Sequence, residues 1–177
     1  MTREISDGDL VTSGQTLEVN VKRISIVSHK SFEEVLQKLT ATIGRPDIKQ
    51  FNEAVTASAT IHDLEEVVKG VIGSSDLMEF IRFDIGEVIR KEHGGDGPKV
   101  IRLVVGNPIL MKEIAKTIPD VASYAPVTIL VDERPDGVHL SYDSLASLIA
   151  PYHSQLALTT AKGTDAKIKQ LLEAAAS

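Results

Sequence analysis

The hydrophobic positions of this chain follow two spacings, the three-to-four-residue spacing of amphipathic helices and the alternating or continuous pattern of strands. Strand patterns occupy five segments, at residues 17–26, 77–83, 100–105, 127–131 and 138–142. Helical spacing occupies most of the stretches between them, at residues 31–43, 46–56, 63–72, 84–91, 107–118 and from 144 onward. The predicted order is therefore strand, helices, strand, helix, strand, helix, hairpin and helices.

Several helix and strand boundaries follow from residues with known preferences for element ends. Ser31 and Glu34 match a capping box, in which each side chain bonds a free backbone N–H of the first turn. Gly44 is expected to end this helix as a left-handed cap, and Pro46 to begin the next helix. In the first strand the apolar alternation changes phase near Lys22, which predicts a bulge or a strand break.

The stretch from residue 99 to 143 is the most informative part of the chain. A nearly continuous apolar strand leads to Asn107, which can cap a helix, and Pro108, which fits the first helical position. A second strand follows, and Asp136 with Gly137 marks the turn to a third. A strand–helix–strand unit beside a hairpin predicts an α+β fold. We expect a single mixed, twisted sheet of about four to six strands with helices packed mainly on one face.

The length of 177 residues fits one domain with a self-sufficient core. The shares of apolar and charged residues, 42% and 25%, are ordinary for a globular protein. Residues 1–16 are polar and show no periodicity, so we expect a flexible N-terminal tail. Residues 17–177 are expected to form a single α/β domain.

Charge and composition exclude several classes of function. A net charge of −6 without a basic cluster argues against nucleic-acid binding, and an aromatic content of 4% leaves few stacking platforms. No segment has the ~18 consecutive apolar residues that predict a membrane span, and the N-terminus lacks the apolar stretch of a signal peptide. The chain has no cysteine, which excludes disulfides and thiolate chemistry. We therefore expect a cytoplasmic protein.

Several segments together resemble the family called Domain of Unknown Function 302. The matching parts are a strand and helix, a Phe-x-x-x-Asp strand end, a Gly-Asn-Pro helix start, a strand introduced by proline and a hairpin ending near Ser-Tyr. They lie at residues 21–43, 80–84, 106–108, 126–131 and 137–142. Residues 44–75 form a longer and more helical connection than the family's usual linker. The resemblance implies a curved sheet, similar in outline to the TATA-box-binding-protein-like class, and often a dimer. It implies no established activity.

Arg82 and Arg102 interrupt strands that are otherwise apolar. Such a residue lies on a solvated face, pairs with an acid such as Glu79 or Asp84, or lines a cavity that holds an anion. A solvated or paired face is the simpler interpretation. If the open side of the sheet forms a pocket, Arg82, Arg102 and Asn107 are the predicted ligand contacts, because a helix start can direct N–H groups at an anion. Capping alone also explains Asn107.

Tyr142, His139 and Asp84 are the candidate groups for acid–base catalysis. A buried tyrosine near Asp84 or Arg82 could act as a general acid, although its ring can simply pack while its hydroxyl meets water. His139 alternates with apolar neighbours and is expected on the face of the sheet opposite to them. The five histidines lack metal-ligand spacing, and no nucleotide-binding or nucleophile motif occurs. We therefore predict no metal site and no cofactor.

Three functions remain open from the sequence. The first is a homodimeric domain that binds a small acidic metabolite without catalysis, through the ligand contacts named above. The second is a metal-independent acid–base enzyme of the isomerase, cyclase or lyase type. The third is a structural or interaction module whose sheet face makes a dimer, since two-fold pairing is the commonest assembly.

Overall fold

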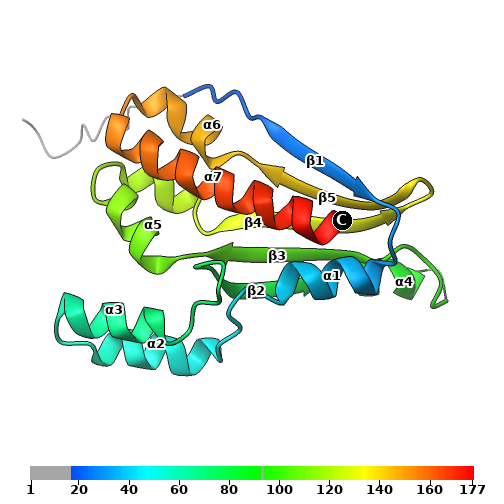
Figure 1. The fold of residues 1–177 in the computed structure, drawn as a ribbon, viewed down its shortest axis with the longest axis horizontal. Helices are drawn as coiled ribbons and strands as arrows, with labels where there is room; N and C mark the ends of the chain where they lie inside the picture. The colour runs from blue at the N-terminus through cyan, green and yellow to red at the C-terminus, as the bar shows by residue number, and fades with distance from the viewer. Residues whose placement is uncertain (1–16, 93) are drawn as a thin grey trace, which may run out of the picture.

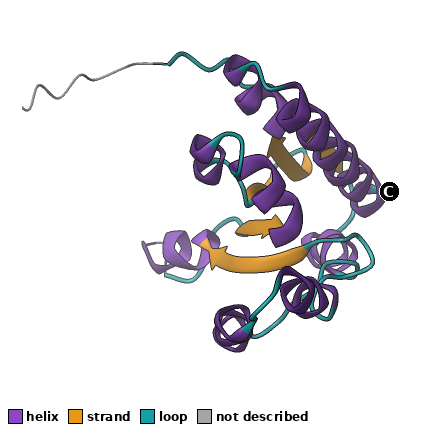
Figure 2. Cartoon of the chain, turned by 90° about the vertical axis from the view of Figure 1, so that its left-hand side faces the viewer, coloured by secondary structure: helices purple, strands orange, loops and turns teal. Residues whose placement is uncertain are grey.

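One sheet of five strands organises the computed structural model of the chain, which describes residues 17–92 and 94–177. The strands are β1 (Arg23–Ser28), β2 (Met78–Asp84), β3 (Val100–Gly106), β4 (Val127–Arg134) and β5 (Gly137–Asp143). They lie in the order β1-β5-β4-β3-β2 (Figure 1), and Figure 2 shows them in orange as a curved layer. The expected flexible tail, residues 1–16, lies outside the described residues.

Helices from both halves of the chain pack on one face of this sheet. The helical elements are α1 (Phe32–Thr40), α2 (Ile48–Ala57), α3 (Ile61–Lys69), α4 (Ile85–Glu92), α5 (Pro108–Ala115), η1 (Pro119–Ser123), α6 (Leu145–Ile149), η2 (Ala150–Tyr152) and α7 (Gln155–Ala176). Buried residues of α1, α5, α6 and α7 join those of the strands in one hydrophobic core, with α7 lying along α1 and β1 (Figure 1). The predicted α+β class with helices mainly on one face is confirmed.

All four neighbouring strand pairs of the described sheet are antiparallel. The sequence predicted a mixed sheet, and the parallel component in the described residues is an isolated bridge between Gly44 and Met78. Between β3 and β4 the chain forms α5 and η1 and then re-enters the sheet near the end at which it left, since Val105 pairs with Val127.

The strand register separates two faces of different composition. On the helix-covered face, one row across the strands joins Ile24, Tyr142, Ile129 and Leu103. The last three of these side chains are almost fully buried. On the opposite face, the neighbouring row joins Ser25, Ser141, Leu130, Arg102 and Phe83. We call this second side, with its hydroxyl, charged and exposed aromatic groups, the open face.

Side-chain caps explain where the first three helices begin. The predicted capping box at Ser31 is present at the start of α1. Helix α2 begins after Pro46, with the carboxylate of Asp47 as its cap. A second capping box, formed by Thr60 and Asp63, begins α3. The local sequence therefore determines these three helix starts, because each cap satisfies N–H groups that the helix cannot bond internally.

Gly44 and Gly73 form a close backbone crossing at the base of the α2–α3 pair. A Cβ atom on Gly44 would lie 1.8 Å from the carbonyl oxygen of Val71, and one on Gly73 would lie 2.0 Å from that of Thr42. The prediction that Gly44 is a left-handed helix cap is wrong, because its φ is not positive and α1 already ends at Thr40. Glycine is needed here for lack of space.

Helices α2 and α3 form a small hydrophobic cluster of their own beyond β2 (Figure 1). Its buried members are Phe51, Val68 and Met78, and the rings of Phe51 and Phe80 meet edge to face with centroids 6.5 Å apart. Residues 44–75 therefore extend the molecule with a second cluster instead of enlarging the main core.

Local irregularities occur in the two edge strands and before α7. Strand β1 begins at Arg23, directly after the break predicted near Lys22, whereas the register shift of the described sheet lies in β2 between Glu79 and Ile81. The predicted helical tail is divided into α6, η2 and α7, with His153 in the left-handed conformation at φ 54° before α7.

Candidate functional site

A hollow of about 190 Å³ lies on the open face of the sheet. Its walls come from four strands, with Arg23 on β1, Arg102 on β3, Thr128 and Leu130 on β4, and Ser141 and Asp143 on β5 with Tyr142 between them. Antiparallel partners project to the same side of a sheet, so two adjacent register rows bring these residues together. The hollow therefore depends on strand pairing and not on any one segment.

Arg102 is the main cationic group of this hollow. Its Nη2 donates to the Thr128 hydroxyl at 3.3 Å, and its guanidinium lies 5.9 Å from the centroid of the Phe83 ring. Among the arginines that the structure describes, Arg102 is the one without a carboxylate oxygen within 4.0 Å. Its charge is therefore held in place by a hydroxyl and an aromatic face, which leaves guanidinium donors for an anion.

Arg23 lies at the same hollow, but its charge is compensated. Its Nε and Nη2 donate to the two carboxylate oxygens of Asp143 at 2.7 and 2.8 Å. The bidentate bond to Arg23 lowers the pKa of the Asp143 carboxyl. The hydroxyls of Ser25 and Ser141 lie 3.5 Å apart on the neighbouring row. The hollow thus combines a neutral ion pair, hydroxyl groups and the net positive charge of Arg102.

Arg82 lies on the other face of the sheet. Its register partner is the buried Leu103, so Arg82 and Arg102 cannot contact the same small ligand. The Nε and Nη2 atoms of Arg82 donate to the carboxylate oxygens of Glu79 at 2.9 and 2.6 Å, and Arg45 lies 3.9 Å from that carboxylate. The structure therefore does not bring the predicted ligand contacts Arg82 and Arg102 together.

Asn107 has the structural role that its position predicts. Its Oδ1 accepts hydrogen bonds from the N–H groups of Ile109 and Leu110 at 2.9 and 3.4 Å, and its Nδ2 donates to the Asp76 carbonyl at 3.1 Å. Capping of α5 and a tie to the preceding loop account for both polar atoms of the side chain. The structure gives Asn107 no contact with the hollow around Arg102.

Tyr142 is buried beneath the helices and bonded to Asp165 of α7. Its hydroxyl donates to the Asp165 carboxylate at 2.6 Å and accepts from the Leu145 N–H at 3.2 Å. Burial, together with the hydrogen bond to this carboxylate, raises the pKa of Tyr142 far above its ordinary value. Neither Asp84 nor Arg82, the neighbours expected from the sequence, is its partner.

His139 and Asp84 lie apart from Tyr142 and from each other. His139 is on the open face, as its alternation predicted, and its Nε2 lies 2.9 Å from the Asp136 carboxylate at the hairpin. Asp84 ends β2, where its carboxylate accepts from the Glu87 N–H at 2.7 Å and lies 3.4 Å from Arg90. The three catalytic candidates therefore occupy three separate environments and form no acid–base pair.

Asp165 is the polar residue that the sequence analysis missed. Besides the tyrosine hydroxyl, its carboxylate accepts from the Ser144 hydroxyl at 2.5 Å and from the N–H groups of Leu145 and Ala146 at 2.8 and 3.2 Å. It thereby caps α6 from a neighbouring helix. The sequence could have indicated that Asp165 faces the core, because it falls at helical spacing among Ala161, Ile168 and Leu172, which are buried.

Residues 17–92 and 94–177 contain no group of three or more histidine, aspartate or glutamate side chains placed to hold a metal ion. In the same residues, each helix is too short or too polar to cross a bilayer.

The model of the family described as Domain of unknown function DUF302 matches residues 53–175. The chain belongs to the DUF302 family. The match begins within α2 and ends in α7, so it includes β3, β4 and β5 and every residue of the hollow around Arg102 except Arg23 of β1. The resemblance inferred from the strand, Gly-Asn-Pro and hairpin segments is confirmed.

A solved structure of the same family supports the fold. The chain is similar to a crystal structure of an uncharacterized conserved DUF302 protein from Bacillus stearothermophilus, with a TM-score of 0.60 and 13% sequence identity. The similarity covers 86% of this chain and 97% of that chain. At this identity the likeness concerns the DUF302 fold alone. No curated protein matches the sequence.

Proposed function

We propose that this DUF302 domain binds a small anionic metabolite, a carboxylate or a phosphate, in the hollow around Arg102. The observation that carries the proposal is that Arg102 alone among the described arginines has no carboxylate within 4.0 Å. A guanidinium offers several donors in a plane, which match the paired oxygens of both anion types. The hydroxyls of Thr128 and Ser141 supply further donors beside it.

The hollow supports binding better than catalysis. Its residues include no buried general base beside a nucleophile, and the tyrosine with the raised pKa points to the opposite side of the sheet. Charge-assisted hydrogen bonds to an exposed arginine give modest affinity, which suits a metabolite sensor or carrier more than an enzyme.

We further propose that two copies meet through the open face near β2. Ile81 and Phe83 are 47% and 45% exposed on this face, and Ile85 and Val88 of α4 add exposed apolar surface along the chain. Contiguous apolar surface of this kind marks interaction sites. The Arg102 guanidinium lies over the Phe83 ring. An anion bound to Arg102 would therefore lie at the border of the contact between copies.

The binding proposal is tested by titrating the labelled protein with citrate and with phosphate at constant ionic strength, followed by amide NMR. We expect changes in amide chemical shift confined to Thr128, Ser141 and their neighbours. The anion that binds with the higher affinity identifies the anion class. Arg102→Ala should weaken binding about tenfold, which is the effect of losing a charge-assisted hydrogen bond. Arg102→Lys should retain part of the affinity.

Arg45→Ala is the matched control, because Arg45 is exposed and its carboxylate partner Glu79 lies on the helix-covered face. This variant should bind the anion as the wild type does. Equal binding by Arg102→Ala and the wild type, with both proteins folded, would reject the site.

A further inference from the structure

A second cavity lies on the helix-covered side of the molecule. It is bounded by the α2–α3 pair on one side and by α5 and η1 on the other. It has a volume of about 310 Å³, at the lower end of the range for small-molecule sites. Its apolar walls are Phe51 and Val55 of α2, Leu64 of α3, Phe80 of β2, Met111 of α5 and Val121 of η1. We call it the α2–α5 cleft.

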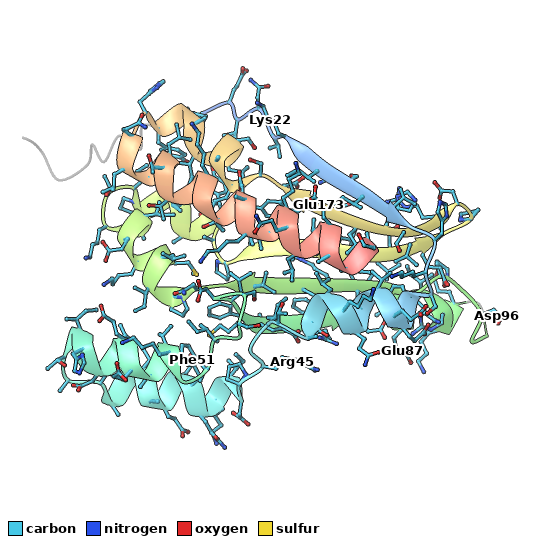
Figure 3. All side chains as sticks on the ribbon, in the orientation of Figure 1. Lys22, Arg45, Phe51, Glu87, Asp96 and Glu173 are labelled. Atoms are coloured by element: carbon cyan, nitrogen blue, oxygen red, sulfur yellow. The ribbon has the colours of Figure 1, made fainter. Side chains whose placement is uncertain are left out.

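The α2–α5 cleft is distinct from the hollow around Arg102. Figure 3 shows Phe51 on the α2–α3 pair, at the opposite edge of the molecule from Lys22, which precedes β1. The two cavities share no lining residue. A ligand in the α2–α5 cleft would therefore bind independently of an anion at Arg102.

The size of the α2–α5 cleft favours a small molecule as its occupant. A volume of about 310 Å³ is about ten times the share of one water molecule in the liquid. An occupant of about ten non-hydrogen atoms would fill the space.

The polar side chains that line the cleft indicate which chemical group its ligand has at one end. Lys112 and Asn52 line it among the apolar side chains. The Lys112 Nζ lies 2.9 Å from a carboxylate oxygen of Glu113, which is also 3.0 Å from the Lys116 Nζ. Two ammonium groups thus share one carboxylate, and this group of residues has a net charge of +1. The arrangement is complementary to one added negative charge.

The outer wall of the cleft is formed by helices that pack in a cluster separate from the main core. Helices α2 and α3 belong to the separate Phe51 cluster and join the rest of the chain at the Gly44–Gly73 crossing. A wall that rests on a small cluster can adjust to an occupant at lower cost than the main core, which is close-packed. Filling the cleft would join the two hydrophobic clusters, since Phe80 and Met111 lie on its two sides.

We propose that the α2–α5 cleft binds a small carboxylic acid with an apolar tail, the tail lying against Phe51, Phe80 and Met111 and the carboxylate against Lys112. The apolar walls provide affinity through burial of the tail. The two lysines share a single carboxylate, and the positive charge that remains selects an acid over an alcohol or an amine. The DUF302 domain would then have two anion-selective sites on opposite sides, one for a polar metabolite and one for an amphipathic acid.

The experiment compares three probes of equal chain length, octanoate, 1-octanol and octylamine, by NMR of the methyl groups of Met111 and Leu64. Octanoate should shift both methyl signals, and octylamine should bind at least about tenfold more weakly because its charge opposes Lys112. Lys112→Met should lower octanoate affinity about tenfold and change 1-octanol affinity less than about twofold. Lys112→Arg should bind octanoate almost as the wild type does.

A matched pair of variants tests the location. Ala122 lines the cleft and Ser123 does not, and both are exposed residues of η1. Ala122→Phe should abolish the methyl shifts, whereas Ser123→Phe should retain them. Octanoate that shifts neither methyl, or that still shifts them in Ala122→Phe, would overturn the site. Equal affinity for all three probes would overturn the proposed acid chemistry. Arg102→Ala should show the same octanoate shifts at the Met111 and Leu64 methyl groups, so the result at the α2–α5 cleft does not depend on the first site.

Discussion

At the scale of single residues, Asp165 shows how one carboxylate can join three elements. It receives the Tyr142 hydroxyl from β5, the Ser144 hydroxyl, and two backbone N–H groups from the start of α6. Buried donors left without a partner are costly, and the Asp165 carboxylate satisfies several of them at once. The tyrosine therefore has a structural role, and its raised pKa follows from burial and from the carboxylate beside it.

Tyr142→Phe should lower the free energy of unfolding by about 2 kcal/mol, the usual range for a hydrogen bond to a charged group. The ring still fills its place, and Asp165 keeps its other donors. Urea unfolding at neutral pH measures the change. Tyr124→Phe serves as control, because the Tyr124 hydroxyl meets the neutral hydroxyl of Tyr152 at 3.1 Å and should contribute less. An equal loss in both variants would contradict the role of Asp165.

The raised pKa of Tyr142 also predicts a dependence on alkaline pH. In the unfolded chain a tyrosine loses its proton near pH 10, whereas the folded protein retains it to higher pH. The folded state then binds more protons than the unfolded state, so stability is complete below about pH 10 and declines above it. The wild type should lose up to about 1.4 kcal/mol per pH unit more than Tyr142→Phe above pH 10. Parallel unfolding curves for the two proteins would exclude this effect.

At the scale of elements, the α2–α3 pair depends on the crossing at its base. The N–H groups of Gly44 and Gly73 both donate to the Leu77 carbonyl at 2.9 Å, which holds the two ends of the pair together beside β2. The two chains approach so closely that neither position has space for a Cβ atom. The placement of the pair, and with it the α2–α5 cleft, is therefore fixed by backbone contacts.

Gly44→Ala should destabilise the protein by more than about 3 kcal/mol, because the new methyl group would overlap the backbone of residue 71. Gly163→Ala is the control. Gly163 lies within α7 with no other atom within 4 Å of an added Cβ, so alanine should stabilise the helix by about 0.5–1 kcal/mol. Thermal unfolding of both variants gives the two changes. A small loss at Gly44 would show that the crossing can move apart.

At the scale of the whole molecule, the sheet has one side that the helices cover and one side that they leave open. The helix-covered side is mainly apolar apart from the Arg82–Glu79 pair of β2, whereas the open face combines Arg102, hydroxyl groups and exposed apolar residues near β2. This division places the proposed anion site and the proposed contact between copies on the same face.

Ile81→Glu should shift the protein from dimer to monomer, because a charge on the open face near β2 would have to lose its water in the contact. Ile81 does not line the hollow around Arg102, so the folded monomer keeps that site. Leu156→Glu is the control, since Leu156 is 63% exposed on α7. Sedimentation velocity measures the assembly. A wild-type monomer, or a dimer that tolerates Ile81→Glu, would reject the proposed contact.

Much of the fold was predictable from local patterns. The capping residues Ser31 and Asn107, the turn at Gly137 and the apolar strands all appear where the sequence places them. The antiparallel arrangement of β3 and β4 was not predicted, because a helical pattern between two strands does not show at which end of the sheet the chain re-enters. The role of Gly44 was also missed, since lack of space around a residue cannot be read from its neighbours in sequence.

By itself, the sequence determined the helices and strands, the α+β class and the family, because caps, turns and hydrophobic periodicity act over a few residues. It also identified Arg82 and Arg102 as charged residues within apolar strands. Only the tertiary structure decided which charges are compensated, because Arg82 and Arg102 look alike in sequence but project to opposite faces of the sheet. Strand register assigns each side chain to a face and to its neighbours, and register is set by contacts between distant segments. Ion pairs, cavities and the candidate sites therefore follow from the fold.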